Sequence, residues 1–254
     1  MAACSSDEPT PVLLQPSLPG SSEVRVKSIT HRGNINGCYD WQFGYSGTRL
    51  VSASASLYNP ASVNIQYNSQ LIYGESTVGI SNSGNLSMGI TLDESHRITY
   101  LTVNKDEYRF VYNEGRITSW DKIVKDVNFG ADVSRARADI EYQNGDLKTI
   151  TYYENNDAPT YYHFTPSETL NTNGLLPELM SKQIGCFGFE HLYYAGLMGE
   201  ATKRLVKSIE IDYPEESGMQ DYSLHFNYSV NKDGHVELCT FTYNGEAARA
   251  DYTY

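Results

Sequence analysis

A two-residue alternation of apolar and polar side chains, broken repeatedly by turn residues, most limits what this chain can fold into. Near the end of the chain, Phe226 and Tyr228 alternate with polar residues, Asp233 and Gly234 follow, and the alternation resumes at Val236. A period of two places successive side chains on opposite faces of a strand. Asp-Gly and Asn-Gly tolerate the positive φ angles of tight hairpin turns. The pattern therefore predicts antiparallel β-hairpins.

The same hairpin pattern recurs along the chain at irregular spacing. Clear copies cover residues 108–117, with the turn Asn-Glu-Gly, and residues 140–147, with the turn Asn-Gly. Tyrosine, which suits half-buried strand positions, outnumbers phenylalanine by 21 to 8. Repetition of one sequence unit usually means that one structural unit is used many times. We therefore expect a mainly all-β fold, a large antiparallel sheet curled into an open or barrel-like shape, as a single domain over residues 23–254.

One segment between Leu170 and Leu205 lacks the alternation and has the spacing of a helix instead. Apolar residues recur there at the positions of one helix face, namely Phe189, Leu192, Tyr193, Gly196 and Leu197. We predict a helical insertion at about residues 174–200. It would contain a short helical turn over Leu175–Met180 and a helix that ends at Gly199. The concave face of the curled sheet would cover this insertion.

The charge balance limits the partners of the chain. Asp and Glu number 31 against 19 Lys and Arg, which gives a net charge of −12 and an isoelectric point near 4.9. Binding of phosphate backbones requires clustered Lys and Arg, so the composition disfavours a nucleic-acid partner. An acidic surface fits an exported domain, and we expect no cofactor.

The first residues resemble the processing site of a bacterial lipoprotein, because Cys4 follows small residues and precedes the polar, acidic run Ser5–Glu8. Residues 1–22 would then be a lipobox remnant and a flexible tether rich in Pro, Ser and acids. This predicts a lipid anchor at Cys4 and a location at the outer membrane, on the cell surface or on the periplasmic face. The residues before Cys4 lack the apolar region of an export signal, and the lipoprotein interpretation therefore expects a truncated signal. A cytosolic protein with an unstructured N-terminus is the alternative.

The other three cysteines, Cys38, Cys186 and Cys239, are odd in number. An exported protein can form a disulfide, but at least one of these thiols would stay free, and their spacing does not suggest zinc. Free thiols that pack as small apolar groups are the favoured interpretation.

The tyrosine-rich hairpins resemble the YD-type repeats of bacterial surface proteins. Their order, followed by the segment His191–Gly199, by Leu205–Ile209 and by a closing hairpin over Phe226–Tyr243, is similar to that of a family of Bacteroidetes lipoproteins of unknown function. The resemblance covers about Val24–Tyr254 and implies an antiparallel sheet curled around a short helix. The run Ser5–Glu8 also resembles the signal that sends such lipoproteins to the cell surface. The family has no established biochemical role, so the resemblance implies no catalytic residues.

No residue cluster in the sequence has the spacing of a catalytic or metal-binding motif. The six histidines lie outside H-E-x-x-H, and no G-x-S-x-G occurs. Cys186 and His191 are close in sequence, but a buried thiol and a histidine at the polar edge of a helix explain that pair. Adjacent acids such as Glu215 and Glu216 would point to opposite faces of a strand or lie in a solvated turn. The sequence therefore predicts no metal site and no catalytic residue, and it leaves enzymatic activity open.

Two tyrosine pairs and the polar turn between them form the one candidate binding surface. The residues are Tyr152, Tyr153, Tyr161, Tyr162, Asn155 and Asp157. Consecutive strand residues point to opposite faces, so one ring of each pair must lie outside the core. An exposed tyrosine beside Asn and Asp can stack on a sugar ring and hydrogen-bond its hydroxyls. The same rings could instead cover an apolar seam between hairpins.

Three functions are compatible with these features. The first is a lipid-anchored binding or scaffolding module for a glycan or a protein, which predicts an accessible aromatic groove. The second is a hydrolase acting on glycans, with two carboxylates, or a histidine and a nucleophile, that converge only in three dimensions. The third is a periplasmic carrier of lipid or lipoprotein, which requires an apolar concavity that the helix does not fill.

Overall fold

The computed structural model describes residues 19–33, 35, 38–58, 66–74, 78–82, 88–125, 132–155, 157–186 and 188–254. Cys4 and most of the expected tether lie outside these residues. The strands are β1 (Ser28–Gly33), β2 (Cys38–Ser46), β3 (Arg49–Tyr58), β4 (Gln66–Tyr73), β5 (Val78–Asn82), β6 (Met88–Leu92), β7 (Ile98–Val103), β8 (Asp106–Asn113), β9 (Arg116–Lys125), β10 (Asp132–Gln143), β11 (Asp146–Glu154), β12 (Thr160–Leu170), β13 (Arg204–Asp212), β14 (Tyr222–Val230), β15 (Val236–Tyr243) and β16 (Glu246–Thr253). Two short helices, α1 (Ser181–Ile184) and α2 (Glu190–Tyr194), lie between β12 and β13, and a 3-10 turn, η1 (Glu215–Ser217), precedes β14.

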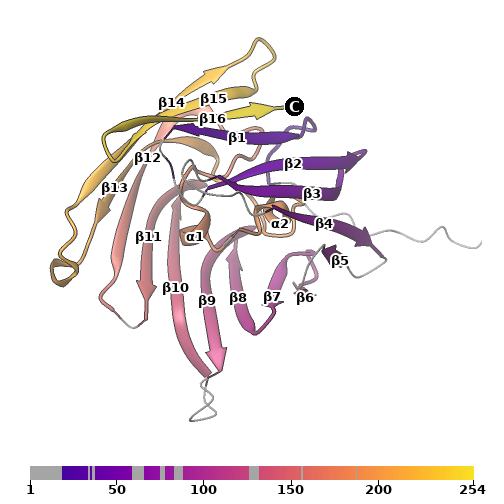
Figure 1. The fold of residues 1–254 in the computed structure, drawn as a ribbon, viewed down its shortest axis with the longest axis horizontal. Coiled ribbons are helices and arrows are strands. Elements are labelled where there is room, and N and C mark those ends of the chain that lie inside the picture. The colour runs from indigo at the N-terminus through magenta and orange to yellow at the C-terminus, as the bar shows by residue number, and fades with distance from the viewer. Residues whose placement is uncertain are drawn as a thin grey trace, which may run out of the picture.

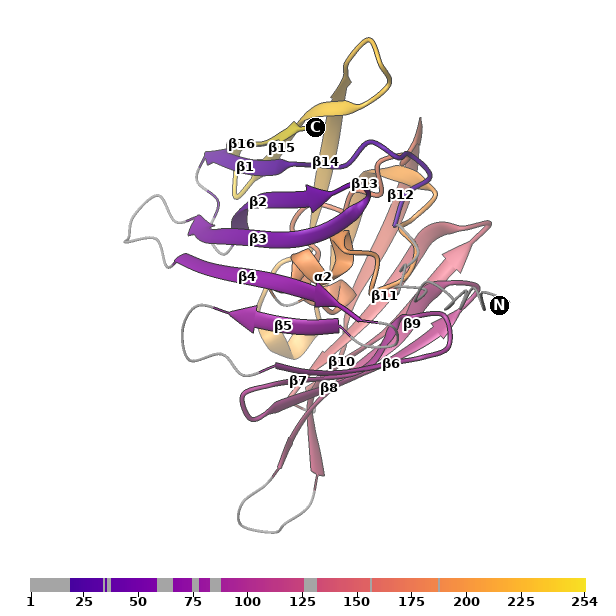
Figure 2. The same ribbon diagram turned by 90° about the vertical axis from the view of Figure 1, so that its right-hand side faces the viewer.

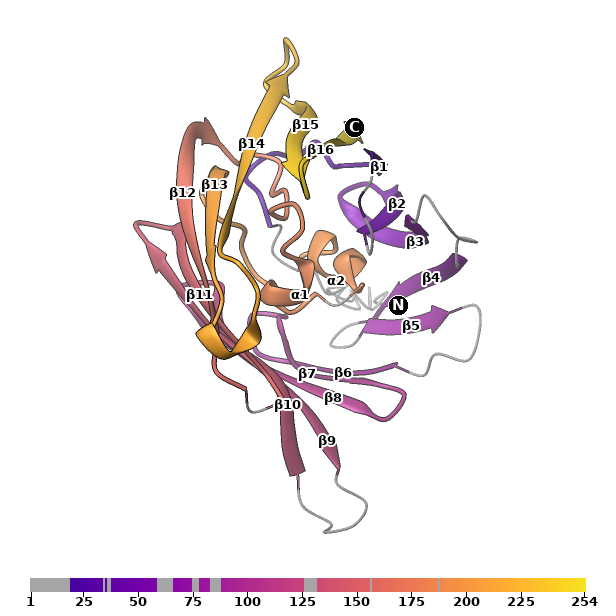
Figure 3. The same cartoon turned by 60° about the vertical axis from the view of Figure 1, so that its left-hand side comes forward.

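The strands form one antiparallel 16-stranded sheet in which sequence neighbours pair with each other, except β5 and β6, which are its two edges. In addition β1 pairs with β16, so that Ser28 lies opposite Thr253 and Gly33 opposite Ala248. The sheet therefore runs from β6 through β16 and β1 to β5, and it curls until it nearly closes into a barrel (Figures 1 and 3). The prediction of a mainly all-β curled sheet is confirmed.

Tight turns join the predicted hairpins. The turn between β10 and β11 consists of Asn144 and Gly145, whose φ angles are 56° and 85°. Positive φ at both central residues is the geometry of a type I′ turn, whose twist matches that of the flanking strands. Glu114 and Gly115 make the same turn between β8 and β9, with φ angles of 48° and 82°. The local pattern of the sequence is therefore sufficient to place these hairpins.

The two faces of the sheet differ in polarity. Along β10, Ala138 and Ile140 are buried inside the curl, whereas Arg137 and Asp139 point outward and are exposed. The outer face of β10 is therefore polar at these positions. In the described residues no helix is long and apolar enough to span a membrane.

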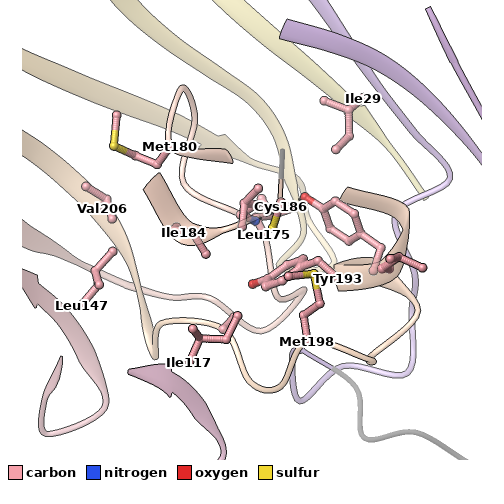
Figure 4. Packing of buried hydrophobic residues seen from close by; sticks show 14 of the residues in the cluster. Ile29, Ile117, Leu147, Leu175, Met180, Ile184, Cys186, Tyr193, Met198 and Val206 are labelled. Atoms are coloured by element: carbon pink, nitrogen blue, oxygen red, sulfur yellow. Dashed lines mark hydrogen bonds between the residues drawn. The ribbon is translucent and has the colours of Figure 1, made fainter. Parts of the chain in front are cut away.

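Residues 171–186 and 188–203 fill the inside of the curled sheet and are called the plug below (Figures 2 and 4). Leu192, Leu197 and Cys186 are completely buried there, and Met198 and Ile184 pack in the same cluster. The side of a helix that faces a core is apolar, and a helix surrounded by core is buried on all sides. The prediction that the sheet covers the insertion is confirmed.

The predicted extent of the helices is wrong. The main helix, α2, has five residues and ends before Gly196, not at Gly199. Gly196 adopts a φ of 80°, its N–H donates to the Tyr193 carbonyl, and the Leu197 N–H donates to the Leu192 carbonyl at 3.0 Å. These are the two hydrogen bonds of a Schellman motif, which closes a helix at a glycine in the left-handed conformation.

The segment Leu175–Met180 is also not the helical turn that we expected. It is irregular, and helix α1 begins only at Ser181. Leu179 has a φ of 66°, which is incompatible with a right-handed helix. The side chain of Asn171 holds the start of the segment, because it accepts from the Leu175 N–H at 2.7 Å and donates to the Leu175 carbonyl at 2.8 Å.

The end of the plug is fastened to the tips of two hairpins. The N–H of Glu200 donates to the Gly115 carbonyl, and the N–H of Lys203 donates to the Gly145 carbonyl, both at 2.9 Å. The Asp146 carboxylate accepts from the guanidinium of Arg204 at 2.7 and 3.0 Å. The turns that end these hairpins therefore also hold the plug in place.

Candidate functional site

A cavity of about 310 Å³ lies between the plug and the sheet wall. Strands β1 and β2 form one side, the strands from β12 to β15 form another, and plug residues 176–183 with part of α2 form the rest. Aromatic side chains supply much of its lining, including Tyr39, Trp41, Tyr162, Tyr194, Tyr213 and Tyr222. We call this space the plug cavity. Tyr222 is 37% exposed, so the cavity reaches the surface on that side.

His31 lies in the wall of the plug cavity between two carboxylates. Its Nδ1 is 3.0 Å from Asp40 Oδ1, and its Nε2 is 3.1 Å from Glu178 Oε2. Glu178 also accepts a short hydrogen bond from the hydroxyl of Tyr252. Tyr252 lies on β16 opposite Ile29, and Ala250, which lies opposite His31, is small enough to leave room for the imidazole.

The pKa of His31 is about 9 in the folded protein. Burial opposes its charge, but the negative charge of Glu178 and the hydrogen bonds with Asp40 and Glu178 outweigh that effect. His31 is therefore an imidazolium at neutral pH. Its buried ion pair with Glu178 joins β1 to the plug.

Asp40 occupies a break in the sheet. The pairing of β1 with β2 ends at Ile29, which lies opposite Trp41. Beyond that point, Asp40 Oδ1 accepts the backbone N–H of His31 at 2.8 Å. The carboxylate thus replaces a missing ladder partner, because a buried N–H requires an acceptor.

A third carboxylate, that of Glu190, lies on the α2 side of the plug cavity. The Ser181 hydroxyl donates a short hydrogen bond to its Oε1. Burial raises the pKa of Glu190, although Ser181 and backbone N–H groups act in the opposite direction. The side chain is 7% exposed, and its Oε2 accepts no hydrogen bond from any residue in the described part of the chain.

The loop that carries Glu178 has an unusual backbone. Leu179, the next residue, has its φ of 66° in the left-handed region, which costs a non-glycine residue on the order of 1–3 kcal/mol. Such a conformation persists where its surroundings fix it. Here His31 and Tyr252 hold Glu178 on one side, and the N–H of Met180 donates to the Pro177 carbonyl at 3.2 Å on the other.

This arrangement suits binding better than nucleophilic catalysis. Both ring nitrogens of His31 face carboxylates, so neither is placed to take a proton from a hydroxyl or a thiol. Burial raises the pKa of Cys38, which lines the same cavity, and nearby acids reinforce the effect, so its thiolate is disfavoured. Within the described residues, no group of three His, Cys, Asp or Glu side chains could hold a metal ion.

The tyrosine pairs predicted from the sequence lie on two different surfaces. Tyr152 and Tyr162 point inward and are buried, and Tyr162 lines the plug cavity. Tyr153 and Tyr161 point outward, where Arg137 lies 4.1 Å from the centre of the Tyr153 ring. The prediction that one ring of each pair lies outside the core is confirmed.

Around the outward rings, the remaining candidates are polar and exposed. Tyr161 stacks on His163 with ring centres 6.4 Å apart. Asn155 and Asp157 lie exposed in the β11–β12 connection, where the N–H of Asn155 donates to the Arg135 carbonyl at 2.9 Å. These four outward residues therefore share the outer surface, whereas the other two candidates do not.

The cysteines and one histidine need separate comment. Cys38, Cys186 and Cys239 are all free, and Cys186 and Cys239 are buried. The expectation of a histidine at a polar helix edge is wrong, because His191 is completely buried, with Trp41 at a ring distance of 5.3 Å. Burial lowers the pKa of His191 to about 3.

Sequence reasoning did not find His31, Asp40, Glu178 and Glu190 as a group. His31 and Glu178 are 147 positions apart, and no local spacing links them. The sequence offered one signal for this group. His31 lies two residues after Ile29, so the alternation of β1 places a titratable side chain on the inward face of the strand.

No family model matches the sequence, and no curated protein matches it. Among solved structures, a porin-like protein from Bacteroides uniformis is similar with a TM-score of 0.70. The match covers 91% of this chain and 98% of that chain, at 15% sequence identity. The two chains share a fold. At this level of identity the likeness does not extend to function.

Proposed function

We propose that this chain is an envelope-associated binding protein whose curled sheet receives a small ligand in the plug cavity. The observation that carries the proposal is the cavity itself, a space of about 310 Å³ lined by aromatic rings and by buried carboxylates. Ligand sites are typically concave, largely apolar and supplied with a few fixed polar groups. The ion pair of His31 and Glu178 would keep one wall of the site in a fixed position.

The location is part of this proposal. Membership of the Bacteroidetes lipoprotein family, with a lipid on Cys4 and a tether up to about residue 22, would hold the domain beside the outer membrane. The fold shared with a porin-like protein of Bacteroides supports an envelope setting. The charged outer face of β10 fits a domain that lies next to the membrane in water.

The outward tyrosines keep a role in this proposal as a contact surface for a glycan or a protein. Tyr161 is 43% exposed, with Asn155 and Asp157 in the adjacent connection. A scaffolding function would use this surface, whereas a small-ligand function would use the plug cavity. The carrier function is less favoured, because the plug fills the concavity that a lipid would need.

One observation favours a second candidate, a glycan hydrolase. Glu178 and Glu190 both line the plug cavity, and burial keeps Glu190 closer to its protonated form. Glycoside hydrolysis usually employs a pair of carboxyl groups as its acid and its base or nucleophile. Release of nitrophenol from a panel of aryl glycosides, lost in Glu190→Gln, would support this function. A flat response across the panel removes it.

The binding function is tested by screening sugars, peptides and small amines against the folded protein, with two variants for comparison. Tyr222→Ala alters the cavity mouth, and Tyr161→Ala alters the outer surface. Binding that is weakened by Tyr222→Ala and unchanged by Tyr161→Ala supports the cavity, and the opposite pattern transfers the function to the outer surface. For the anchor, Cys4→Ala in the full-length protein should release it from the membrane fraction, and unchanged fractionation contradicts a lipid at Cys4.

A further inference from the structure

A groove on the outer face of the sheet is separate from the plug cavity. It measures about 440 Å³ and lies over strands β14, β15, β16 and β1, which are neighbours in the sheet (Figure 1). Its lining includes one polar side chain from each of these strands in turn, namely Asn227, Thr240, Arg249 and Arg32. No described residue lines both spaces, so the groove is a second and independent place on the fold.

The pairing of the strands places these four side chains in one row. Arg32 lies opposite Arg249, where β1 meets β16. On β15, Thr240 lies opposite Arg249 on one side and opposite Asn227 on the other. Arg249 stands between two buried alanines, so the row points away from the core. Neighbouring strands are about 4.8 Å apart, and the row is therefore about 14 Å long.

The arginine end of the row has an excess of positive charge. The Nε atoms of Arg249 and Arg32 lie 3.2 and 3.3 Å from the same oxygen, Asp251 Oδ2, so the two guanidinium groups are close together. Asp251 is the one carboxylate that pairs with either arginine in the part of the chain that the structure describes. Arginine is always charged. Two cations against one anion leave a local positive charge on a chain whose net charge is −12.

Both guanidinium groups are accessible to a ligand. The side chains of Arg32 and Arg249 are 64% and 43% exposed. A guanidinium has five N–H donors, and a contact through Nε occupies one of them. Its planar fork matches the oxygens of a carboxylate or a phosphate, and a sulfate ester presents tetrahedral oxygens like those of phosphate. The pair can therefore hold an oxyanion from the groove.

The rest of the row favours an acidic sugar over a simple anion. Thr240 and Asn227 are neutral side chains that both donate and accept hydrogen bonds, and the exposed Thr242 and His225 lie beside them in the groove. A small anion would use the arginines alone, whereas a sugar chain also has hydroxyls for the neutral end of the row. An anionic membrane surface is disfavoured, because the net charge of −12 repels it.

We propose that this groove binds an acidic sugar chain, with a carboxylate or sulfate group on the two arginines and with sugar hydroxyls on Thr240 and Asn227. The inference goes beyond the proposed function, because the groove shares no described residue with the plug cavity. It is also distinct from the surface of the outward tyrosines, which lie on β11 and β12.

The test compares charged and neutral sugars of equal length on the wild-type protein by calorimetry. The probes are tetragalacturonate with its methyl ester, and a sulfated carrageenan tetrasaccharide with its desulfated form. We expect the charged member of at least one pair to bind at least tenfold more tightly than its neutral partner. Equal affinities within both pairs, or no binding by any probe, overturn the inference without any variant.

Matched variants locate the interaction. Arg32→Gln and Arg249→Gln each remove one cation, so each should weaken binding of the charged sugar at least tenfold and leave binding of the neutral partner unchanged. The control is Arg109→Gln, at an exposed arginine on the outer face of β8, which should change neither. Affinities that are equal in wild type and in both groove variants overturn the assignment. Thermal unfolding of each variant establishes that a loss of binding is measured on folded protein.

Two further measurements separate the sugar from a membrane and the groove from the plug cavity. Cosedimentation with phosphatidylglycerol vesicles that Arg249→Gln abolishes, without binding of a charged sugar, makes the groove a membrane contact and overturns the inference. Tyr222→Ala, at the mouth of the plug cavity, should leave binding of the charged sugar unchanged. If it weakens that binding at least tenfold, the sugar lies in the plug cavity, so this inference falls and the proposed function stands.

Discussion

The imidazole of His31, on the first strand, lies 3.1 Å from the carboxylate of Glu178, in the plug, across 147 positions of sequence. This contact joins the seam where β1 meets β16 to the irregular loop before α1, and Tyr252 of β16 bonds the same carboxylate. The plug is therefore held at two ends. The other end is fastened to the β8–β9 and β10–β11 turns.

Removing one partner of this buried pair should be costly. His31→Gln leaves Asp40 and Glu178 without their shared cation, and an uncompensated buried charge costs about 3–5 kcal/mol. Glu178→Gln should cost less, because Asp40 still neutralises His31. In urea unfolding, the double variant should lose less stability than the sum of the single variants, by roughly 1–3 kcal/mol. Strict additivity of the two losses would contradict a direct interaction between His31 and Glu178. The control is His225→Gln at an exposed position, which should change the free energy of unfolding by less than about 0.5 kcal/mol.

The same contact predicts a loss of stability in base. The pKa of His31 rises from 6.5 to about 9 on folding, so its contribution is fully present below pH 6.5 and is lost as the pH rises through 9. At 1.36 kcal/mol per unit, the contribution is about 3 kcal/mol. Unfolding free energies measured from pH 6 to pH 9.5 should fall more steeply in wild type than in His31→Gln. Parallel curves for the two proteins contradict the assignment.

The buried His191 should make the free energy of unfolding fall as the pH is lowered, which is the opposite of the effect of His31. Its pKa falls from 6.5 to about 3 on folding, so the stabilisation from keeping it neutral is present above pH 6.5 and is lost as the pH falls towards 3. The loss is up to about 5 kcal/mol for a shift of this size. His191→Gln keeps a polar side chain without the titration, so its stability should fall less than that of wild type between pH 6.5 and 4. The exposed His225→Gln serves again as the control, with the slope of wild type.

Features that depend on neighbouring residues could be predicted from the sequence, and features that depend on distant pairing could not. Asn144-Gly145 specifies its own turn through φ angles that few other residues tolerate. The alternation also required one ring of Tyr152-Tyr153 to lie outside the core, but only the burial of Ile150 in the same strand decides which one.

The plug and its cavity are the parts that the sequence left undetermined. Both Gly196 and Gly199 have positive φ angles, and the pattern alone did not show which of them ends the helix. The cluster of His31, Asp40 and Glu178 exists because β1 pairs with β16 and the plug folds back against both. Contacts of this kind have no periodicity in sequence, so they emerge only from the closed sheet.

Close packing of the plug against the wall predicts a further difference, between two glycines. Gly185, which ends α1, has a φ of 97°, and a Cβ there would lie 2.8 Å from Cδ1 of Trp120. Gly234, in the β14–β15 turn, has a φ of 84°, but a Cβ there would meet no atom within 4 Å. Both substitutions to Ala incur the cost of the left-handed conformation, about 1–2 kcal/mol. Gly185→Ala should lose a further 1–3 kcal/mol, roughly, through overpacking against the indole. Urea unfolding of the two variants measures this difference directly, and equal losses would mean that the plug does not press on Trp120.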